Sequence, residues 1–227
     1  MKIYIVSCDK GRQERLLTKA SPLNLDIEFI ESYKKDDPII EKKAWKLIEK
    51  GDAYPTGVAA TLGHMIAMQK LLDSPDTHCM IGEDDIRFDK KFNEKLKAVL
   101  KYIDQCDVFT IGGCSDTVPI GPVTDTDYEG VSFIKNAEHG NPWGAQLYII
   151  SREYAEYFLN KFSVDDLSRV YDYKFVTDCV IFDPRYCNRF SLMESIAIED
   201  PDEQTIAGNV NKMPIPMLNV NRDDFYF

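Results

Sequence analysis

The sequence of 227 residues has no long hydrophobic run. No stretch approaches the ~20 consecutive apolar residues that a membrane-spanning helix needs. The first apolar run covers only Ile3 to Val6, which is too short for the core of a signal peptide. We therefore expect a cytoplasmic protein without a membrane span.

Basic clusters and paired cysteines are also missing. Lys and Arg form no run and the net charge is −11, so the sequence argues against nucleic-acid binding. The six cysteines contain no C-x-x-C pair and have no histidine at zinc spacing. Cys8, Cys79 and Cys179 lie within apolar runs, which indicates buried free thiols in a reducing compartment.

The sequence does have a series of apolar runs typical of strands, which alternate with segments whose apolar residues recur at helical spacing. Strands are predicted at residues 3–7, 25–32, 79–82 and 108–111, and helices at 38–51, 56–72 and 89–103. Residues 115–129 are predicted to be a long loop, and later strands are followed by a helix that Ser151 caps. This order predicts an α/β fold with a mixed, mainly parallel sheet.

Three acidic residues end one of the predicted strands. Met80, Ile81 and Gly82 are followed directly by Glu83-Asp84-Asp85. Ligands of such sheets collect beyond the carboxyl ends of the strands. Crowded carboxylates repel each other, and a divalent cation such as Mg²⁺ or Mn²⁺ removes that repulsion while it binds substrate phosphates. The alternative interpretation is a solvated acidic cap on the helix predicted from Asp89.

The wider pattern is more specific than the acidic triplet. One helix, Thr56–His64, leads to the strand Met80–Asp85. This resembles glycosyltransferase family 25, in which a helix motif ending in Leu-Ser-His precedes a strand ending in Leu-Glu-Asp-Asp. Three more stretches are similar to the family in the same order: Ile3–Ser7 with Arg12 and Arg15, Trp143–Ser151, and Glu203–Thr205.

The sequence departs from the family pattern in two places. The residues before the histidine are Thr56-Gly57-Val58-Ala59-Ala60 where the family has Gly-Glu-x-Gly-Cys, and Gly63 replaces the serine before His64. The resemblance implies a GT-A type, Rossmann-like α/β domain. It implies a single domain over residues 1–227, with a donor half at about 1–113 and an acceptor half at about 114–227.

The resemblance also implies an activity and its cofactor. It implies transfer of a hexose from a nucleoside-diphosphate sugar, preferably a UDP-sugar, to a glycan acceptor, with inversion and with Mn²⁺ or Mg²⁺. Asp85 is the expected metal ligand. The expected donor-binding residues are Ser7, Arg12, Arg15, Thr56, Gly57, His64, Glu83 and Asp84.

The acceptor side is assigned fewer residues. Asp178 is the expected catalytic base, because it is a single acid that enters an apolar segment; Asp116, Asp200 and Asp202 are the reserve candidates. His139 and Trp143 are expected to bind the acceptor. His64 has a competing interpretation as a core histidine, because its helix is apolar nearly all round.

Two other functions stay open at this level. A nucleotidyltransferase or a phosphatase-like hydrolase would also use an acidic strand end, but the sequence lacks a glycine-rich phosphate loop and an Asp-x-Asp-x-Thr strand end. A degenerate domain that only binds carbohydrate is the non-catalytic alternative. We expect a monomer or a weak homo-oligomer.

Overall fold

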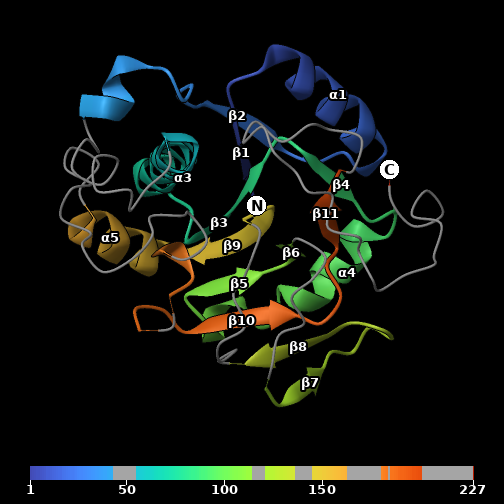
Figure 1. The fold of residues 1–227 in the computed structure, drawn as a ribbon. Coiled ribbons are helices and arrows are strands. Elements are labelled where there is room, and N and C mark those ends of the chain that lie inside the picture. Colours follow the sequence, from blue (N-terminus) through green and yellow to red (C-terminus); the bar gives the residue numbers. More distant parts are fainter. Residues whose placement is uncertain (43–54, 114–120, 136–144, 163–179, 184, 201–226) are drawn as a thin grey trace.

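The computed structural model describes residues 1–42, 55–113, 121–135, 145–162, 180–183, 185–200 and 227. These residues form a central sheet of eight strands with helices on both faces (Figure 1). The strands follow one another across the sheet as β2 (Ile27–Glu31), β1 (Ile3–Ser7), β3 (His78–Glu83), β9 (Leu147–Ser151), β5 (Val108–Thr110), β10 (Arg189–Leu192), β8 (Ser132–Lys135) and β7 (Val123–Asp125).

The sheet is mixed, and most of its strands point the same way. β1 is parallel to β2 and β3, and β5 is parallel to β10. β9 runs antiparallel to both β3 and β5, and β8 runs antiparallel to β10 and β7. All strands except β9 and β8 therefore share one direction, which confirms the predicted α/β class with a mainly parallel sheet.

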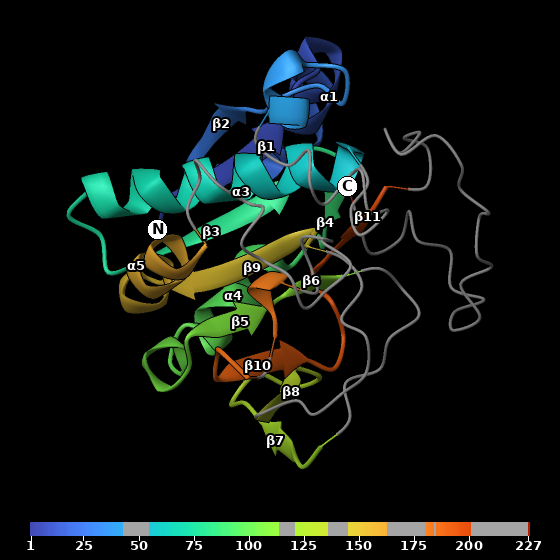
Figure 2. The ribbon, with the colours of Figure 1, turned by 60° about the vertical axis from the view of Figure 1, so that its left-hand side comes forward.

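Each face of the sheet packs against its own pair of helices. α3 (Pro55–Asp73) and α5 (Arg152–Lys161) cover one face, together with side chains such as Tyr4, Ile81 and Tyr148. α1 (Lys10–Ala20) and α4 (Phe92–Val99) cover the other face, where Ile3, Met80 and Phe109 point. Successive side chains along the strands point to opposite faces and thus contribute to two hydrophobic cores. Figure 2 shows α3 lying across the sheet above β3.

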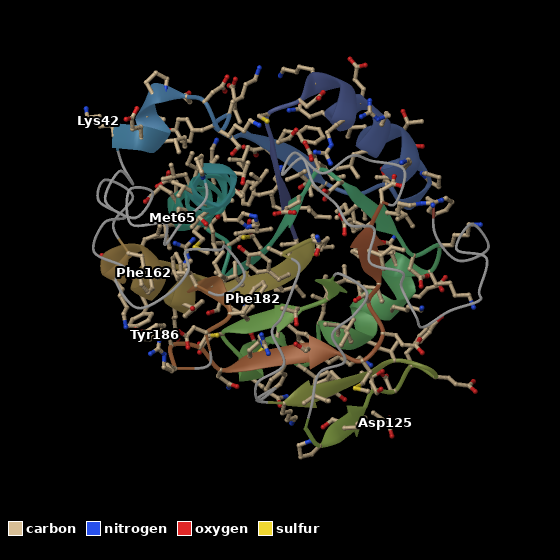
Figure 3. All side chains as sticks on the ribbon, viewed as in Figure 1. Lys42, Met65, Asp125, Phe162, Phe182 and Tyr186 are labelled. Atoms are coloured by element: carbon tan, nitrogen blue, oxygen red, sulfur yellow. The ribbon has the colours of Figure 1, made fainter. Side chains whose placement is uncertain are left out.

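The helix α3 forms as the sequence predicts. It begins at Pro55, where the missing N–H of proline costs no intrahelical bond, and it is buried on most sides. Met65, which Figure 3 labels on α3, is fully buried. The helix predicted from Pro38 also begins there, over the described residues 38–42.

A second, small sheet was not predicted. It has the order β4 (Ile86–Phe88), β11 (Ala197–Glu199) and β6 (Gly112–Gly113). β4 occupies residues between the acidic triplet and the helix that was expected to start at Asp89. That helix is shorter than predicted, because the chain first pairs with β11 and α4 begins only at Phe92.

Two smaller corrections concern loops and turns. The loop predicted over residues 115–129 contains β7, which pairs with β8 at the edge of the large sheet. Two short 3₁₀ helices are also present: η1 (Ser21–Leu23) follows α1, and η2 (Ile103–Gln105) precedes β5.

Among the residues that the structure describes, no helix combines the length and apolar character that crossing a bilayer requires.

Candidate functional site

The acidic triplet lies where β3 leaves the large sheet. Glu83 is the last residue of β3, and Asp84 and Asp85 form the bend that leads into β4. Glu83 is level with Val6 of β1, so the triplet lies at the carboxyl ends of these parallel strands. Asp84 and Asp85 are each only 7% exposed, which excludes the solvated acidic cap.

Arg12 of α1 binds both aspartates. Asp9 caps the helix by accepting bonds from the backbone N–H groups of Gly11 and Arg12, which fixes the first turn. The guanidinium places Nη1 3.0 Å from Asp84 Oδ1 and Nη2 3.2 Å from Asp85 Oδ2. One buried cation is therefore shared between two buried carboxylates.

Asp84 has both of its oxygens engaged. Its Oδ1 faces Arg12, and its Oδ2 accepts a hydrogen bond of 2.6 Å from the Ser7 hydroxyl at the end of β1. Ser7 and Asp84, both expected at the donor site, are thus brought together. The contacts suit Asp84 to hold the turn in place.

Asp85 has one oxygen left over. Its Oδ2 faces Arg12, whereas its Oδ1 is buried and has no hydrogen-bond partner among the described residues. Burial and the neighbouring Glu83 charge raise the pKa of Asp85 well above its usual range, although Arg12 opposes the shift. A carboxylate oxygen that is buried and unpartnered is costly, and a cation satisfies it.

The oxygen ligands of the acidic turn fit a hard divalent cation that takes most of its other ligands from substrate and water. Among the described residues, no three His, Cys, Asp or Glu side chains are arranged to hold a metal ion together. Mg²⁺ and Mn²⁺ sites that serve phosphate substrates commonly use only one or two carboxylates, with substrate oxygens and water completing the shell. Asp85 Oδ1 is suited to be one such ligand.

His64 of α3 approaches the triplet from the opposite face of the sheet. Its Nδ1 lies 3.0 Å from the Tyr148 hydroxyl, and its Nε2 lies 3.7 Å from Glu83 Oε1. Its ring is also stacked on that of Tyr148. The histidine is fully buried, as the core interpretation requires, yet it also contacts the acidic triplet. Burial, with the Asp84 charge, raises the pKa of Glu83.

The end of β11 closes the site from the other side. The backbone N–H of Asp200 donates to the carbonyl oxygen of Asp85 at 2.6 Å, and the Asp200 carboxylate pairs with Lys19 of α1. Asp200, a reserve candidate for the base, is buried in this ion pair. Lys19 and Tyr148 were not predicted as site residues, although Lys19 lies seven residues after Arg12 and so on the same face of α1.

The remaining predicted residues lie on α1, at the start of α3 or outside the described part. Arg15 is exposed on α1, and its charge adds to the backbone hydrogen bond from Arg12 that lowers the pKa of Asp9. Thr56 and Gly57 form the first turn of α3. Five residues lie outside the described residues: Asp178, His139, Trp143, Asp116 and Asp202.

No protein-family model and no curated protein matches the chain. Among solved structures it is similar to a glycosyltransferase involved in the glycosylation of the major capsid of PBCV-1, with 9% identity and a TM-score of 0.42 over 89% of this chain and 93% of that chain. HddC from Yersinia pseudotuberculosis complexed with GMP-PN matches with 14% identity and a TM-score of 0.42, over 87% and 92% of the two chains.

The inositol-1-phosphate CTP transferase from T. maritima is a third match, with 10% identity and a TM-score of 0.36 over 93% of this chain and 92% of that one. Scores this low carry no argument about activity.

Proposed function

We propose that the chain is a metal-dependent glycosyltransferase that moves a hexose from a nucleoside-diphosphate sugar, preferably a UDP-sugar, to a glycan acceptor. One observation carries the proposal. Asp85 Oδ1 is a buried carboxylate oxygen without a partner among the described residues, at the carboxyl end of a strand in a mainly parallel sheet. A nucleotide-bound divalent cation would neutralise the Asp85 carboxylate, and the carboxyl end of a strand is where ligands of such sheets bind.

The residues around Asp85 then take distinct roles. Asp85 is the proposed ligand of Mn²⁺ or Mg²⁺, and the bound cation would neutralise charge on the leaving diphosphate. Arg12 holds Asp84 and Asp85 in register through its two contacts of 3.0 and 3.2 Å. A direct contact of Arg12, Arg15, Thr56 or Gly57 with the donor stays a prediction.

The acceptor side of the proposal depends on residues outside the described part. Asp178 stays the predicted base, and His139 and Trp143 stay the predicted acceptor contacts. Inversion at the anomeric carbon, a cytoplasmic location and a monomeric or weakly associated state also stay predictions. None of them is needed for the donor-side argument.

Turnover of sugar nucleotides tests the proposal. The purified chain is incubated with a panel of UDP-, GDP- and CDP-sugars and Mn²⁺, with and without simple glycan acceptors. We expect release of the nucleoside diphosphate from one donor, and loss of that release in Asp85→Ala. Asp125→Ala is the matched control, because Asp125, labelled in Figure 3, is exposed and lies on the edge strand β7, which four strands separate from β3.

The products also separate the alternatives. A parallel incubation supplies nucleoside triphosphates with hexose 1-phosphates, and release of pyrophosphate there would indicate a nucleotidyltransferase instead. The proposal would be overturned if the chain bound none of the donors and hydrolysed none of them. Glycan binding that Asp85→Ala leaves intact, without any turnover, would indicate the non-catalytic alternative.

A further inference from the structure

A second buried oxygen acceptor lies beside the acidic turn. Gln146, directly before β9, is only 4% exposed, and its Oε1 has no hydrogen-bond partner among the described residues. Because β9 runs antiparallel to its neighbours, its start meets the carboxyl ends of β3 and β5. Gln146 and Asp85 therefore each carry, at the same edge of the sheet, an acceptor oxygen that no described residue satisfies.

The backbone holds Gln146 firmly in this place. Its carbonyl oxygen accepts a hydrogen bond of 3.1 Å from the N–H of Glu83. A Cβ added to Gly82 would lie 2.4 Å from that carbonyl oxygen, and a Cβ added to Gly112 would lie 2.9 Å from the Leu147 nitrogen. The start of β9 is thus enclosed by two glycines, whose missing side chains let the three strands approach closely.

The chemistry of an amide suits it to a hydroxyl ligand. A carboxamide is neutral and offers both an acceptor and two N–H donors, so it pairs with a sugar hydroxyl, which is itself a donor and an acceptor. A buried acceptor without a partner is unfavourable, and a ligand hydroxyl removes that penalty. Ligand sites typically have a few such fixed polar groups that set orientation and specificity.

We propose that Gln146 binds a hydroxyl group of the transferred hexose and so determines which hexose the site accepts. The proposal rests on the proposed glycosyltransferase function, and it assigns Gln146 to the sugar while Asp85 serves the diphosphate and its cation. The Gln146 backbone is hydrogen-bonded to Glu83, and Glu83 precedes Asp85 by two residues, so the two proposed contacts lie close together along the edge of the sheet.

Donor selectivity of Gln146→Ala tests the assignment. We expect kcat/KM for the preferred donor to fall about tenfold, the usual effect of losing one neutral hydrogen bond. The preference between epimeric donors such as UDP-glucose and UDP-galactose should shrink by a similar factor. The KM for Mn²⁺ and inhibition by the free nucleoside diphosphate should not change. Gln105→Ala, an exposed glutamine in η2 before β5, is the matched control.

Deoxy-sugar donors make the test specific for the contact. A donor that lacks the contacted hydroxyl should react equally fast with the wild-type chain and with Gln146→Ala, because neither can form the bond. Gln146→Met, which keeps a similar length and adds no charge but loses the acceptor and the N–H donors, should lose the selectivity as Gln146→Ala does. Circular dichroism melting of each variant checks that the fold is intact.

The outcomes separate this inference from the proposed function. Turnover with unchanged selectivity in Gln146→Ala would overturn the assignment of Gln146 alone. A uniform loss of rate across full and deoxy donors would also overturn it, because it would indicate a purely structural role. Absence of turnover by the wild-type chain with every donor would overturn the proposed function, and this inference with it.

Discussion

Two consecutive aspartates in this protein have different surroundings. Asp84 and Asp85 are equally buried, and both contact Arg12. Asp84 also accepts a bond from Ser7, so both of its oxygens are occupied, whereas Oδ1 of Asp85 has no partner among the described residues. Neighbouring side chains, rather than residue type, therefore make one aspartate structural and leave the other available for chemistry.

Neutralising Asp85 should remove metal binding without unfolding the chain. In Asp85→Asn the side chain keeps its shape and loses a charge that the folded state holds at a cost. We expect the melting temperature without metal to stay the same or rise, and the increase caused by Mn²⁺ to disappear. Differential scanning fluorimetry measures both, with Asp125→Asn as the control. An undiminished Mn²⁺ response in Asp85→Asn would contradict the assigned ligand.

The raised pKa of Asp85 predicts a pH dependence of stability. Burial and Glu83 raise the pKa from 3.8 to about 8, so between these values the folded state binds more protons than the unfolded state. Stability without metal should therefore fall as pH rises through this window. Bound Mn²⁺ needs the ionised carboxylate, so its stabilising effect should grow with pH.

Urea unfolding at pH 5.5 and pH 8, with and without Mn²⁺, measures this dependence, because pH 5.5 lies within the window between about 3.8 and 8 and pH 8 lies at its upper end. Because other groups titrate too, the informative quantity is the difference between the wild-type chain and Asp85→Asn. A difference that does not change with pH would show that the Asp85 carboxyl has an ordinary pKa in the folded state.

At the scale of elements, α1 holds the acidic turn through two cations. Arg12 binds Asp84 and Asp85, and Lys19, two turns later, binds Asp200, whose N–H donates to the Asp85 carbonyl. The helix thus connects β3, β4 and the end of β11.

Removing Arg12 should cost far more stability than removing Arg15 from the same helix. Arg12→Ala leaves two buried carboxylates without their shared cation, which typically costs about 3–5 kcal/mol. Arg15→Ala changes an exposed position and should alter the free energy of unfolding by less than about 0.5 kcal/mol. Urea unfolding measures both values. Equal effects of the two substitutions would contradict the role given to Arg12.

The glycine before His64 lets α3 approach β1 closely. A Cβ added to Gly63 would lie 2.3 Å from Val6 Cγ1 and 2.9 Å from Ser32 Oγ. Gly63→Ala should therefore destabilise the chain by about 1–3 kcal/mol, although alanine is the better helix former by about 1 kcal/mol. This contact gives a physical reason for glycine where the resembling family has serine.

A double-mutant cycle with Val6→Ala checks that contact. If Val6 fills the space above Gly63, the double variant Val6→Ala with Gly63→Ala should lose less free energy of unfolding than the sum of the losses in the two single variants. Additive effects would show that the clash is relieved elsewhere. The free energies of unfolding of the four chains provide the measurement.

The elements that sequence analysis predicted well are those with local signals. Residues 3–6 form an apolar run, α3 carries an apolar pattern over its whole length, and Ser151 caps α5 by accepting from Tyr154 N–H. β4 was missed because its short segment is stabilised by pairing with Ala197–Glu199, far away in the sequence. No local pattern of three residues can specify such a partner.

The candidate site was predicted to a similar extent. The triplet, Ser7 and Arg12 were expected at one place, and the structure brings them together. Gln146 and Tyr148 were missed, because they come from a strand that enters the sheet between two earlier ones. Which strands become neighbours depends on the topology of the sheet, and the order of elements along the chain does not determine that topology.

At the scale of the whole molecule, one sheet joins the two predicted halves. β9, from the acceptor half, lies between β3 and β5 of the donor half, and β10 continues the sheet beyond β5. Neither half can complete its sheet without the other. We therefore expect urea unfolding to be a single cooperative transition, with coincident midpoints in far-UV and near-UV circular dichroism. Separate midpoints would contradict a single folding unit.

The insertion of β9 also has a consequence while the chain is being made. β3 can pair with β1 early, but its other side stays open until residues 147–151 emerge from the ribosome, and β5 waits for both β9 and β10. The nascent chain therefore carries apolar strand edges that favour aggregation. The duration of that exposure is set by the speed of translation through residues 84–146 for β3 and through residues 111–188 for β5, which no gain in stability of the finished sheet can shorten.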